Sequence, residues 1–332
     1  AQPYQESAGV TGRQTSRQAT RQRTRKPSSQ RGQVRGCLGN RNRKRNRRHG
    51  PINALKRSWR KANWPTRIKM VLIPTVAVVV VVALVAGLVR FTNWRAQVRA
   101  AEAAQLELTR TYDFNPGNII SDGQFFNGSA MSQAEVQSFL DTQGGSLAAM
   151  TFDTSNESGE GLCADYTGTK GESAAAIIDQ SARACKVSQK VLLTVMQKEQ
   201  HLVTAVDPSD YQLMAAMGLN CPDTADCDPA YAGFFRQVYG AAKRYRYYLE
   251  HEEQYGYTAH NLNYIQYHPN AACGGAQVYI ENKATALLYI YTPYQPNIAA
   301  LAAGNGTGDS CSSYGNRNFA LIYTSWFGSP RS

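Results

Sequence analysis

The chain has 332 residues, of which 36 are Lys or Arg and 24 are Asp or Glu, so its formal net charge is +12. Residues 1–69 contain 20 basic residues and one acid and carry +19, which leaves 12 minus 19, or −7, for residues 70–332. This asymmetry excludes a uniformly basic nucleic-acid-binding protein, because the long C-terminal part is mildly acidic. That part is long enough for one large domain with a hydrophobic core.

Residues 1–69 are rich in Arg, Gln, Ser, Thr and Gly and contain few apolar side chains. Such a segment buries too little apolar surface to offset the entropy of ordering, so we expect a disordered cytoplasmic tail. The basic run at residues 41–48 could attract anionic lipid, nucleic acid or cytoplasmic partners. The composition favours the alternative, which is a solvated tail that only enforces membrane topology.

Residues 70–89 form a run of twenty residues without a charged side chain. At 1.5 Å per residue, such a helix crosses a hydrocarbon core of about 30 Å, and Trp64 and Trp94 lie where interfacial anchors belong. A cleaved signal peptide would have a shorter basic region and a shorter apolar run, so we predict an uncleaved single-pass anchor in the cell membrane. Because basic residues stay on the cytoplasmic side, we expect the N-terminus inside and the C-terminal part outside.

Residues 90–111 are Ala-rich with paired charges and predict a helical stalk, and residues 112–332 predict an extracytoplasmic domain. Capping residues and apolar periodicity predict helices at residues 133–143, 174–186, 189–203, 229–245 and 282–291. The best strand candidates are residues 277–280 and 320–324. We therefore predict a mainly α domain, of α+β type, with small β-hairpins.

Six of the seven cysteines follow the apolar run, and only Cys37 precedes it. The six are Cys163, Cys185, Cys221, Cys227, Cys273 and Cys311. An even set outside the membrane and a single thiol inside are what an oxidising exterior predicts. Six cysteines allow 15 pairings, among which we expect pairing in chain order.

Glu199 is the most informative candidate for chemistry. In the predicted helix at residues 189–203 it shares a face with the apolar residues Leu192, Met196 and Val203. A carboxyl partly surrounded by hydrocarbon is disfavoured in its charged form, which suits the general acid of glycoside cleavage. The alternative is a structural ion pair with Arg183 or Arg236, and spacing alone does not separate the two interpretations.

The segment VLLTVMQKEQHLV at residues 191–203 resembles the catalytic helix of the lysozyme-like superfamily, especially soluble lytic transglycosylases and goose-type lysozymes. In those families an apolar helix ends in a catalytic Glu that is usually followed by Ser. Here Gln200 stands at the Ser position, so the resemblance implies that Gln200 contacts substrate. Downstream, AAMGL at residues 215–219 resembles their Gly-Leu-Met-Gln segment, with Asn220 and Cys221 where Met-Gln would be.

The resemblance implies a lysozyme-like domain that cleaves peptidoglycan glycan strands. Glu199 would donate a proton to the glycosidic oxygen between MurNAc and GlcNAc and then act as base while a 1,6-anhydro ring closes. A hydrolase would need a second carboxylate, for which Asp207 and Asp210 are the nearest candidates. Neither lies in a recognisable motif, so we favour the single-acid mechanism.

A second resemblance covers about residues 115–328. It rests on NIISD at 118–122, CPDT at 221–224 and YGNRNF at 314–319. These segments resemble a group of actinobacterial secreted or membrane-anchored surface proteins of poorly defined role. The resemblance implies a location at the cell surface.

Tyrosine is the second signal for sugar binding, because its ring packs on pyranose faces and its hydroxyl forms hydrogen bonds. Eighteen of the 19 tyrosines follow the apolar run. Tyr211, Tyr264 and Tyr267 are predicted groove residues because they lie in polar loops or follow the Glu199 helix. Tyr239 and Tyr245 are predicted core residues, because they lie on the apolar face of an amphipathic helix.

No cofactor or metal site is predicted. Asp223, Asp226 and Asp228 could offer oxygen ligands to calcium, but the spacing lacks the glycine and terminal Glu of an EF-hand loop. A polar turn is therefore favoured there. The favoured function is a membrane-anchored peptidoglycan-cleaving enzyme. The alternatives are a non-catalytic surface protein that binds glycan or a partner, and a protein whose functional end is the basic tail.

Overall fold

The computed structural model describes residues 50–222 and 227–332, and the chain divides into two compact units at residue 74. Several predicted features therefore lie outside the described residues: the basic run at 41–48, Cys37, Asp223 and Asp226.

The first unit contains the described part of the expected tail. Residues 51–61 form helix α1 (Pro51–Lys61), and helix α2 (Trp64–Tyr112) begins three residues later. The expectation of disorder up to residue 69 therefore does not hold for this segment. Pro51 occupies the first turn, where its missing N–H costs nothing, and the apolar residues recur on one helical face.

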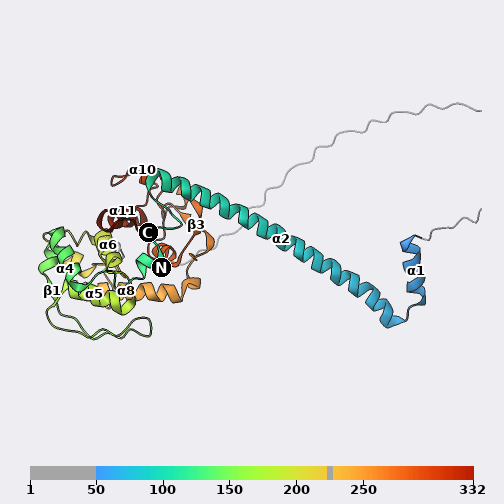
Figure 1. The fold of residues 1–332 in the computed structure, drawn as a ribbon, viewed down its shortest axis with the longest axis horizontal. Coiled ribbons are helices and arrows are strands. Elements are labelled where there is room, and N and C mark those ends of the chain that lie inside the picture. The colour runs from blue at the N-terminus through green and yellow to red at the C-terminus, as the bar shows by residue number, and fades with distance from the viewer. Residues whose placement is uncertain (1–49, 223–226) are drawn as a thin grey trace, which may run out of the picture. The chain divides into compact units, whose positions relative to one another are not determined.

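Helix α2 runs without interruption through the predicted span and the predicted stalk (Figure 1). Among the described residues it is the one helix long and apolar enough to cross a membrane, and none of its apolar window is buried by the protein. Its last turns differ, because Val98, Ala101 and Gln105 are buried. These turns therefore pack against the domain that follows α2, which is called the outer domain below after its predicted location.

The outer domain is mainly helical, with two small antiparallel sheets. Its helices are α3 (Asp122–Phe125), α4 (Gln133–Gln143), α5 (Ala174–Cys185), α6 (Gln189–Gln200), α7 (Asp210–Met214), α8 (Phe234–Glu250), α9 (Lys283–Tyr291), α10 (Ile298–Ala302) and α11 (Gly315–Phe327). Its strands are β1 (Thr151–Phe152), β2 (Glu172–Ser173), β3 (Asn261–Gln266) and β4 (Gly275–Ile280). Single 3-10 turns lie at Ser146–Ala149, Glu252–Gln254 and Ala271–Cys273.

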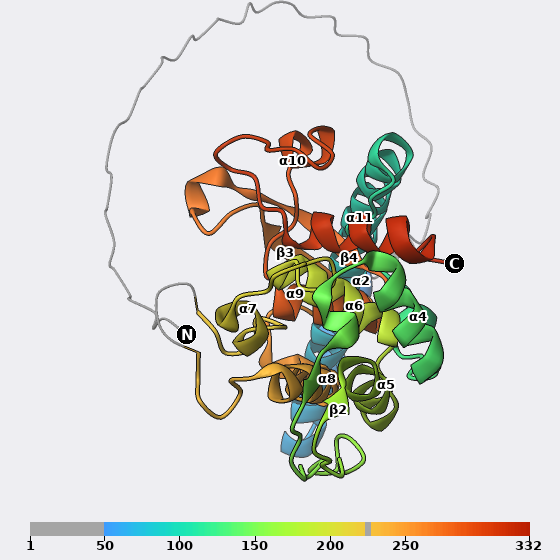
Figure 2. The same cartoon turned by 90° about the vertical axis from the view of Figure 1, so that its left-hand side faces the viewer.

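Helix α6 lies in the interior of this domain. It packs against α11 and α5, and α5 in turn packs against α4 and α8 (Figure 2). Every residue from Val191 to Gln197 is buried, so the whole circumference of the helix contacts protein. Such a helix is a rigid support for the side chains at its C-terminal end.

Most predicted helices are confirmed by their capping contacts. Ser132 and Glu135 form the predicted capping box at α4, Ser173 caps α5, and Asn282 caps α9. Helix α8 starts later than the predicted residue 229. The Asp228 carboxylate accepts a hydrogen bond from the backbone N–H of Ala230, which closes a turn before the helix can begin.

The strand predictions were partly correct. Residues 277–280 lie in β4, which pairs with β3, a strand that was not predicted. The prediction of a strand at 320–324 was wrong, because these residues lie inside α11. The buried residues Asn316, Phe319, Ala320 and Tyr323 recur at helical spacing, so α11 buries a helical stripe.

The three predicted disulfides form in chain order. The pairs are Cys163–Cys185, Cys221–Cys227 and Cys273–Cys311. All six cysteines lie in the outer domain, as an oxidising compartment predicts.

Gln105 fastens the last turns of α2 to the outer domain. Its side-chain oxygen accepts a hydrogen bond of 2.8 Å from the Tyr279 N–H, and its amide donates one of 3.2 Å to the Tyr279 carbonyl. The side chain thus pairs with the outer edge of β4 as a neighbouring strand would. It is 3% exposed, so these hydrogen bonds are shielded from water.

Replacing Gln105 with leucine is expected to destabilise the outer domain by about 1–3 kcal/mol, because it leaves the Tyr279 N–H and carbonyl buried without partners. The measurement is thermal or urea unfolding of the detergent-solubilised chain. The matched control is Gln97→Leu, the same change at an exposed position of α2, which should alter stability by less than about 0.5 kcal/mol. Equal effects at the two positions would contradict the role of Gln105.

Candidate functional site

Glu199 lies at the C-terminal end of α6, one residue before the helix ends. The helix stops at Gln200, earlier than the predicted residue 203, because His201 adopts a left-handed conformation with φ of 52°. The Glu199 side chain is 26% exposed, so it is only partly buried, as predicted from the apolar face. The buried body of α6 holds this carboxylate at the point where the helix reaches solvent.

The ion-pair partner of Glu199 is Lys198, its neighbour in the chain. Neither predicted partner contacts it: Arg183 pairs with Asp179 at 2.9 Å, and Arg236 donates to the Pro229 carbonyl. The Lys198 side chain is 7% exposed, so its ammonium is largely shielded from water.

Two groups on and after α9 keep the Lys198 ammonium at this place. Its Nζ atom donates a hydrogen bond of 3.2 Å to Thr292 Oγ1 and lies 5.8 Å from the centre of the Tyr291 ring. A cation over an aromatic face is attracted to it, most strongly where water is excluded. Lys198 is therefore a fixed positive charge beside the Glu199 carboxylate.

Gly218 forms the wall next to the carboxylate. A Cβ atom at this position would lie 3.3 Å from both Cδ and Oε2 of Glu199. The backbone here has φ of +70°, a conformation that glycine adopts without strain. Glycine therefore lets the chain turn and leaves room for the Glu199 side chain.

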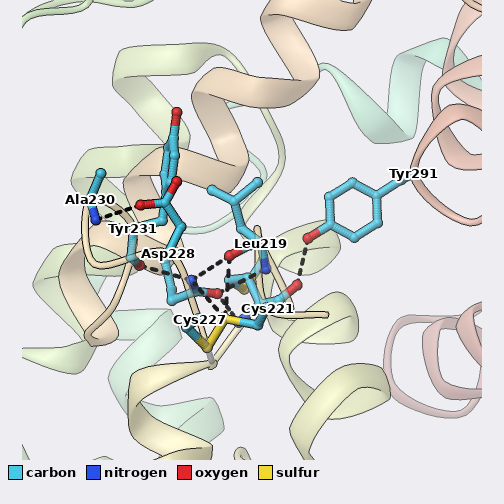
Figure 3. Close-up of a disulfide and its surroundings, with 9 residues drawn as sticks. Leu219, Cys221, Cys227, Asp228, Ala230, Tyr231 and Tyr291 are labelled. Carbon is cyan, nitrogen blue, oxygen red and sulfur yellow. Dashed lines mark hydrogen bonds between the residues drawn. A yellow bond between two sulfur atoms is a disulfide. The ribbon is translucent and has the colours of Figure 1, made fainter. Parts of the chain in front are cut away.

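The loop that carries Gly218 is held from two sides. Gln237 of α8 accepts hydrogen bonds from the backbone N–H groups of Met217 and Leu219 and donates to the Leu219 carbonyl. From the other side, the Tyr291 hydroxyl donates to the Met217 carbonyl. Figure 3 draws Tyr291 and Leu219 in the surroundings of the Cys221–Cys227 disulfide. These contacts fix the wall against which Glu199 lies.

Tyr245 and Tyr291 form a stacked pair near Glu199, with 5.0 Å between ring centres. Burial raises the pKa of both phenols, and the Glu199 charge raises it further. Both hydroxyls are therefore protonated at neutral pH. The buried Tyr245 hydroxyl has no hydrogen-bond partner among the described residues, so one unpaired donor lies in this region.

The predicted substrate-binding residues lie on several elements. The Gln200 carbonyl accepts a hydrogen bond of 2.7 Å from Gln212, which ties α7 to the end of α6. Tyr211 precedes Gln212 on α7 and is 47% exposed, so it lies on the surface near this junction. Asp210 begins the same helix, and Asp207 lies exposed in the loop before it.

Tyr264 and Tyr267 lie on and just after β3. Tyr264 is 55% exposed, whereas Tyr267 is half-buried. Burial raises the pKa of the Tyr267 phenol, and the neighbouring Tyr264 raises it further. No contact among the described residues joins either ring to Glu199.

The sequence analysis did not identify Lys198, Tyr291 or Gly218 as residues of this site. For Gly218 a signal existed, since it lies in the AAMGL segment.

A cavity of about 590 Å³ lies beside α6 and α11. Its lining includes Gln197, His201, Asn318 and Trp326. Gln197 and Glu199 are two residues apart on one helix, so they point to opposite sides. The cavity and the Glu199 carboxylate therefore lie on different faces of α6.

Among the described residues, no group of three or more His, Cys, Asp or Glu side chains is arranged to hold a metal ion. Asp228, the described member of the predicted calcium set, uses its carboxylate in the turn before α8.

Replacing Gly218 with alanine is expected to lower any activity of the Glu199 site at least about tenfold, since the new methyl group displaces the carboxylate by a few tenths of an ångström or more. The left-handed backbone should also cost about 1–2 kcal/mol of stability. The control is Gly171→Ala, where φ is +66° and nothing lies near the new Cβ. It should show the stability loss alone, and equal activity in the two variants would contradict the assignment.

The outer domain is thus a mainly helical, disulfide-linked domain that holds one partly exposed carboxylate beside a fixed ammonium. The chain belongs to the family described as LasA, N-terminal domain, which matches residues 118–332. Comparisons with curated proteins and with solved structures gave no match.

Proposed function

We propose that this protein is a membrane-anchored, extracytoplasmic enzyme that cleaves peptidoglycan glycan strands, with Glu199 as its catalytic carboxylate. The observation that carries the proposal is the placement of Glu199. It lies one residue before the end of a buried helix, is partly open to solvent, and lies against a glycine and a fixed ammonium. Membership of the LasA N-terminal domain family favours an extracellular location.

The proposed topology has α2 as the membrane span, the residues before it in the cytoplasm and the outer domain outside. Six basic residues and no acid lie between residues 50 and 69, which favours retention of that end in the cytoplasm. Three disulfides in the outer domain favour an oxidising compartment.

In the proposed reaction, protonated Glu199 gives its proton to the glycosidic oxygen, and the bond from that oxygen to C1 of MurNAc breaks. Lys198 then stabilises the negative charge left on Glu199. The carboxylate next takes the proton of the C6 hydroxyl of the same sugar while the C6 oxygen bonds to C1. The products are a 1,6-anhydro end and a free hydroxyl, and Glu199 is protonated again.

A lysozyme-like fold is part of this proposal. A hydrolytic outcome would require a second carboxylate at a defined separation from Glu199. Asp207 and Asp210 are exposed and follow α6 closely in the chain, but no contact among the described residues joins them to Glu199. The single-acid route therefore fits the site better.

The test is mass spectrometry of purified peptidoglycan after incubation with the full chain in detergent micelles. We expect fragments that end in 1,6-anhydro-MurNAc. Reducing-end fragments alone would support hydrolysis, and unchanged peptidoglycan would contradict an enzymatic function.

A second candidate function is non-catalytic glycan binding, and the cavity beside α6 and α11 favours it. Amide side chains and the Trp326 indole in its lining are groups that bind sugars. In that case the chain should co-sediment with insoluble peptidoglycan without cleaving it, and His201→Ala should weaken sedimentation while Glu199→Gln should not.

A further inference from the structure

Helix α1 has two chemically distinct faces. Ile52, Leu55 and Trp59 recur at intervals of three and four residues, so they share one side of the helix. They are 70%, 64% and 41% exposed. The described part of the protein therefore leaves most of this apolar face uncovered.

The other face is cationic. It carries four basic residues, Lys56, Arg57, Arg60 and Lys61, and α1 contains no acidic residue. A second copy of α1 would place four positive charges against four, which opposes pairing of two such helices. A surface that binds both faces of α1 must therefore offer an apolar layer to the first face and negative charges beside that layer to the second.

The junction with α2 ties α1 to the turn of α2 that precedes the uncharged run. Arg67 donates a hydrogen bond of 3.1 Å to the Trp59 carbonyl, and its guanidinium lies 5.9 Å from the centre of the Trp59 ring. The uncharged run begins three residues later, at Met70. Trp59 is thus tied to the turn of α2 that enters the bilayer in the proposed topology.

We infer that α1 lies along the cytoplasmic surface of the membrane, with its apolar face in the acyl-chain boundary and its basic face among anionic phospholipid headgroups. Its 11 residues extend about 16 Å, which is too short to cross the bilayer. An amphipathic helix of this kind binds through apolar burial together with attraction to anionic lipid. The phosphates of a nucleic acid would pair with the basic side chains of α1, but Ile52, Leu55 and Trp59 would stay exposed to water.

The test uses the full chain reconstituted into vesicles of phosphatidylcholine, with or without phosphatidylglycerol, whose acyl chains carry bromine as a quencher. The difference between the fluorescence of the wild type and of Trp59→Phe isolates the Trp59 signal. Because both leaflets carry the quencher, the orientation of the protein in the vesicles does not matter. We expect a blue-shifted, strongly quenched Trp59 in vesicles that contain phosphatidylglycerol, and weaker quenching in phosphatidylcholine alone.

Two variants with the same charge change separate apolar burial from simple charge attraction. Leu55→Glu places a carboxylate on the apolar face and should abolish the quenching, whereas Asn53→Glu places it on the basic face and should retain most of it. An unquenched Trp59 in both vesicle types would overturn the inference. So would a Trp59 emission that responds to added duplex DNA but not to phosphatidylglycerol.

Discussion

Replacing Glu199 with glutamine is expected to lower turnover on glycan strands by about 10²-fold or more, the usual contribution of a positioned acid or base. The amide has nearly the same shape and cannot exchange the proton. Its side-chain oxygen can still accept the hydrogen bond from Lys198, which also keeps its contacts with Thr292 and Tyr291. We therefore expect a stability loss of no more than about 1–2 kcal/mol.

Glu252→Gln is the matched control. Glu252 is also a carboxylate paired with a lysine, Lys283, and it is more deeply buried than Glu199. This change should destabilise the domain at least as much as Glu199→Gln while leaving turnover per folded molecule unchanged. If Glu199→Gln caused a large drop in melting temperature with unchanged turnover per folded molecule, Glu199 would be a structural ion-pair member.

Removing the Cys273–Cys311 disulfide by replacing both cysteines with serine is expected to cost about 4 kcal/mol of folding free energy. The bridge spans 38 residues, so its loss restores a large loop-closure entropy to the unfolded chain. The closed segment contains β4, α9 and α10, including Thr292, which contacts Lys198. Loss of the bridge should therefore disturb one wall of the candidate site as well.

The measurement is urea unfolding of the chain under oxidising conditions. The Cys221–Cys227 bridge spans only six residues, and the same replacement there should cost about 2 kcal/mol. The ratio of the two losses of folding free energy tests whether loop-closure entropy explains the stabilisation. Equal losses from the two bridges would contradict that explanation. Peptide mapping that found the six cysteines unpaired would contradict the oxidising compartment itself.

Features set by residues close together in the chain were predicted well. The uncharged run at 70–89, the capping box of Ser132 and Glu135 and the N-cap of Asn282 each depend on a few neighbouring residues. The failures arose where local patterns were ambiguous. The short apolar stretch at 320–324 suits a strand or a buried helix, and the helical stripe of α11 becomes clear only over a longer window.

In the candidate site, too, the features set by neighbouring residues were predicted and the contacts made by folding were not. The sequence alone identified Glu199 as a carboxyl on an apolar helical face, together with the six cysteines that form disulfides. It did not identify the partner, because Lys198 precedes Glu199 in the chain and by helical geometry points to a different side of α6. Its long side chain reaches the carboxylate because Thr292 and Tyr291 hold the ammonium there.

The sequence by itself determined the charge asymmetry, the membrane-spanning candidate, most helices and the cysteines available for pairing, because these depend on composition, periodicity and caps. Only the tertiary structure decided that Gln105 pairs with β4, that Gly218 lies against Glu199 and that Lys198 is its ion-pair partner. The contacts of Gln105 with β4 and of Gly218 with Glu199 join segments that are distant in the chain, whereas Lys198 and Glu199 are neighbours. Which segments meet is set by how the whole domain packs around α6, and no local pattern contains that information.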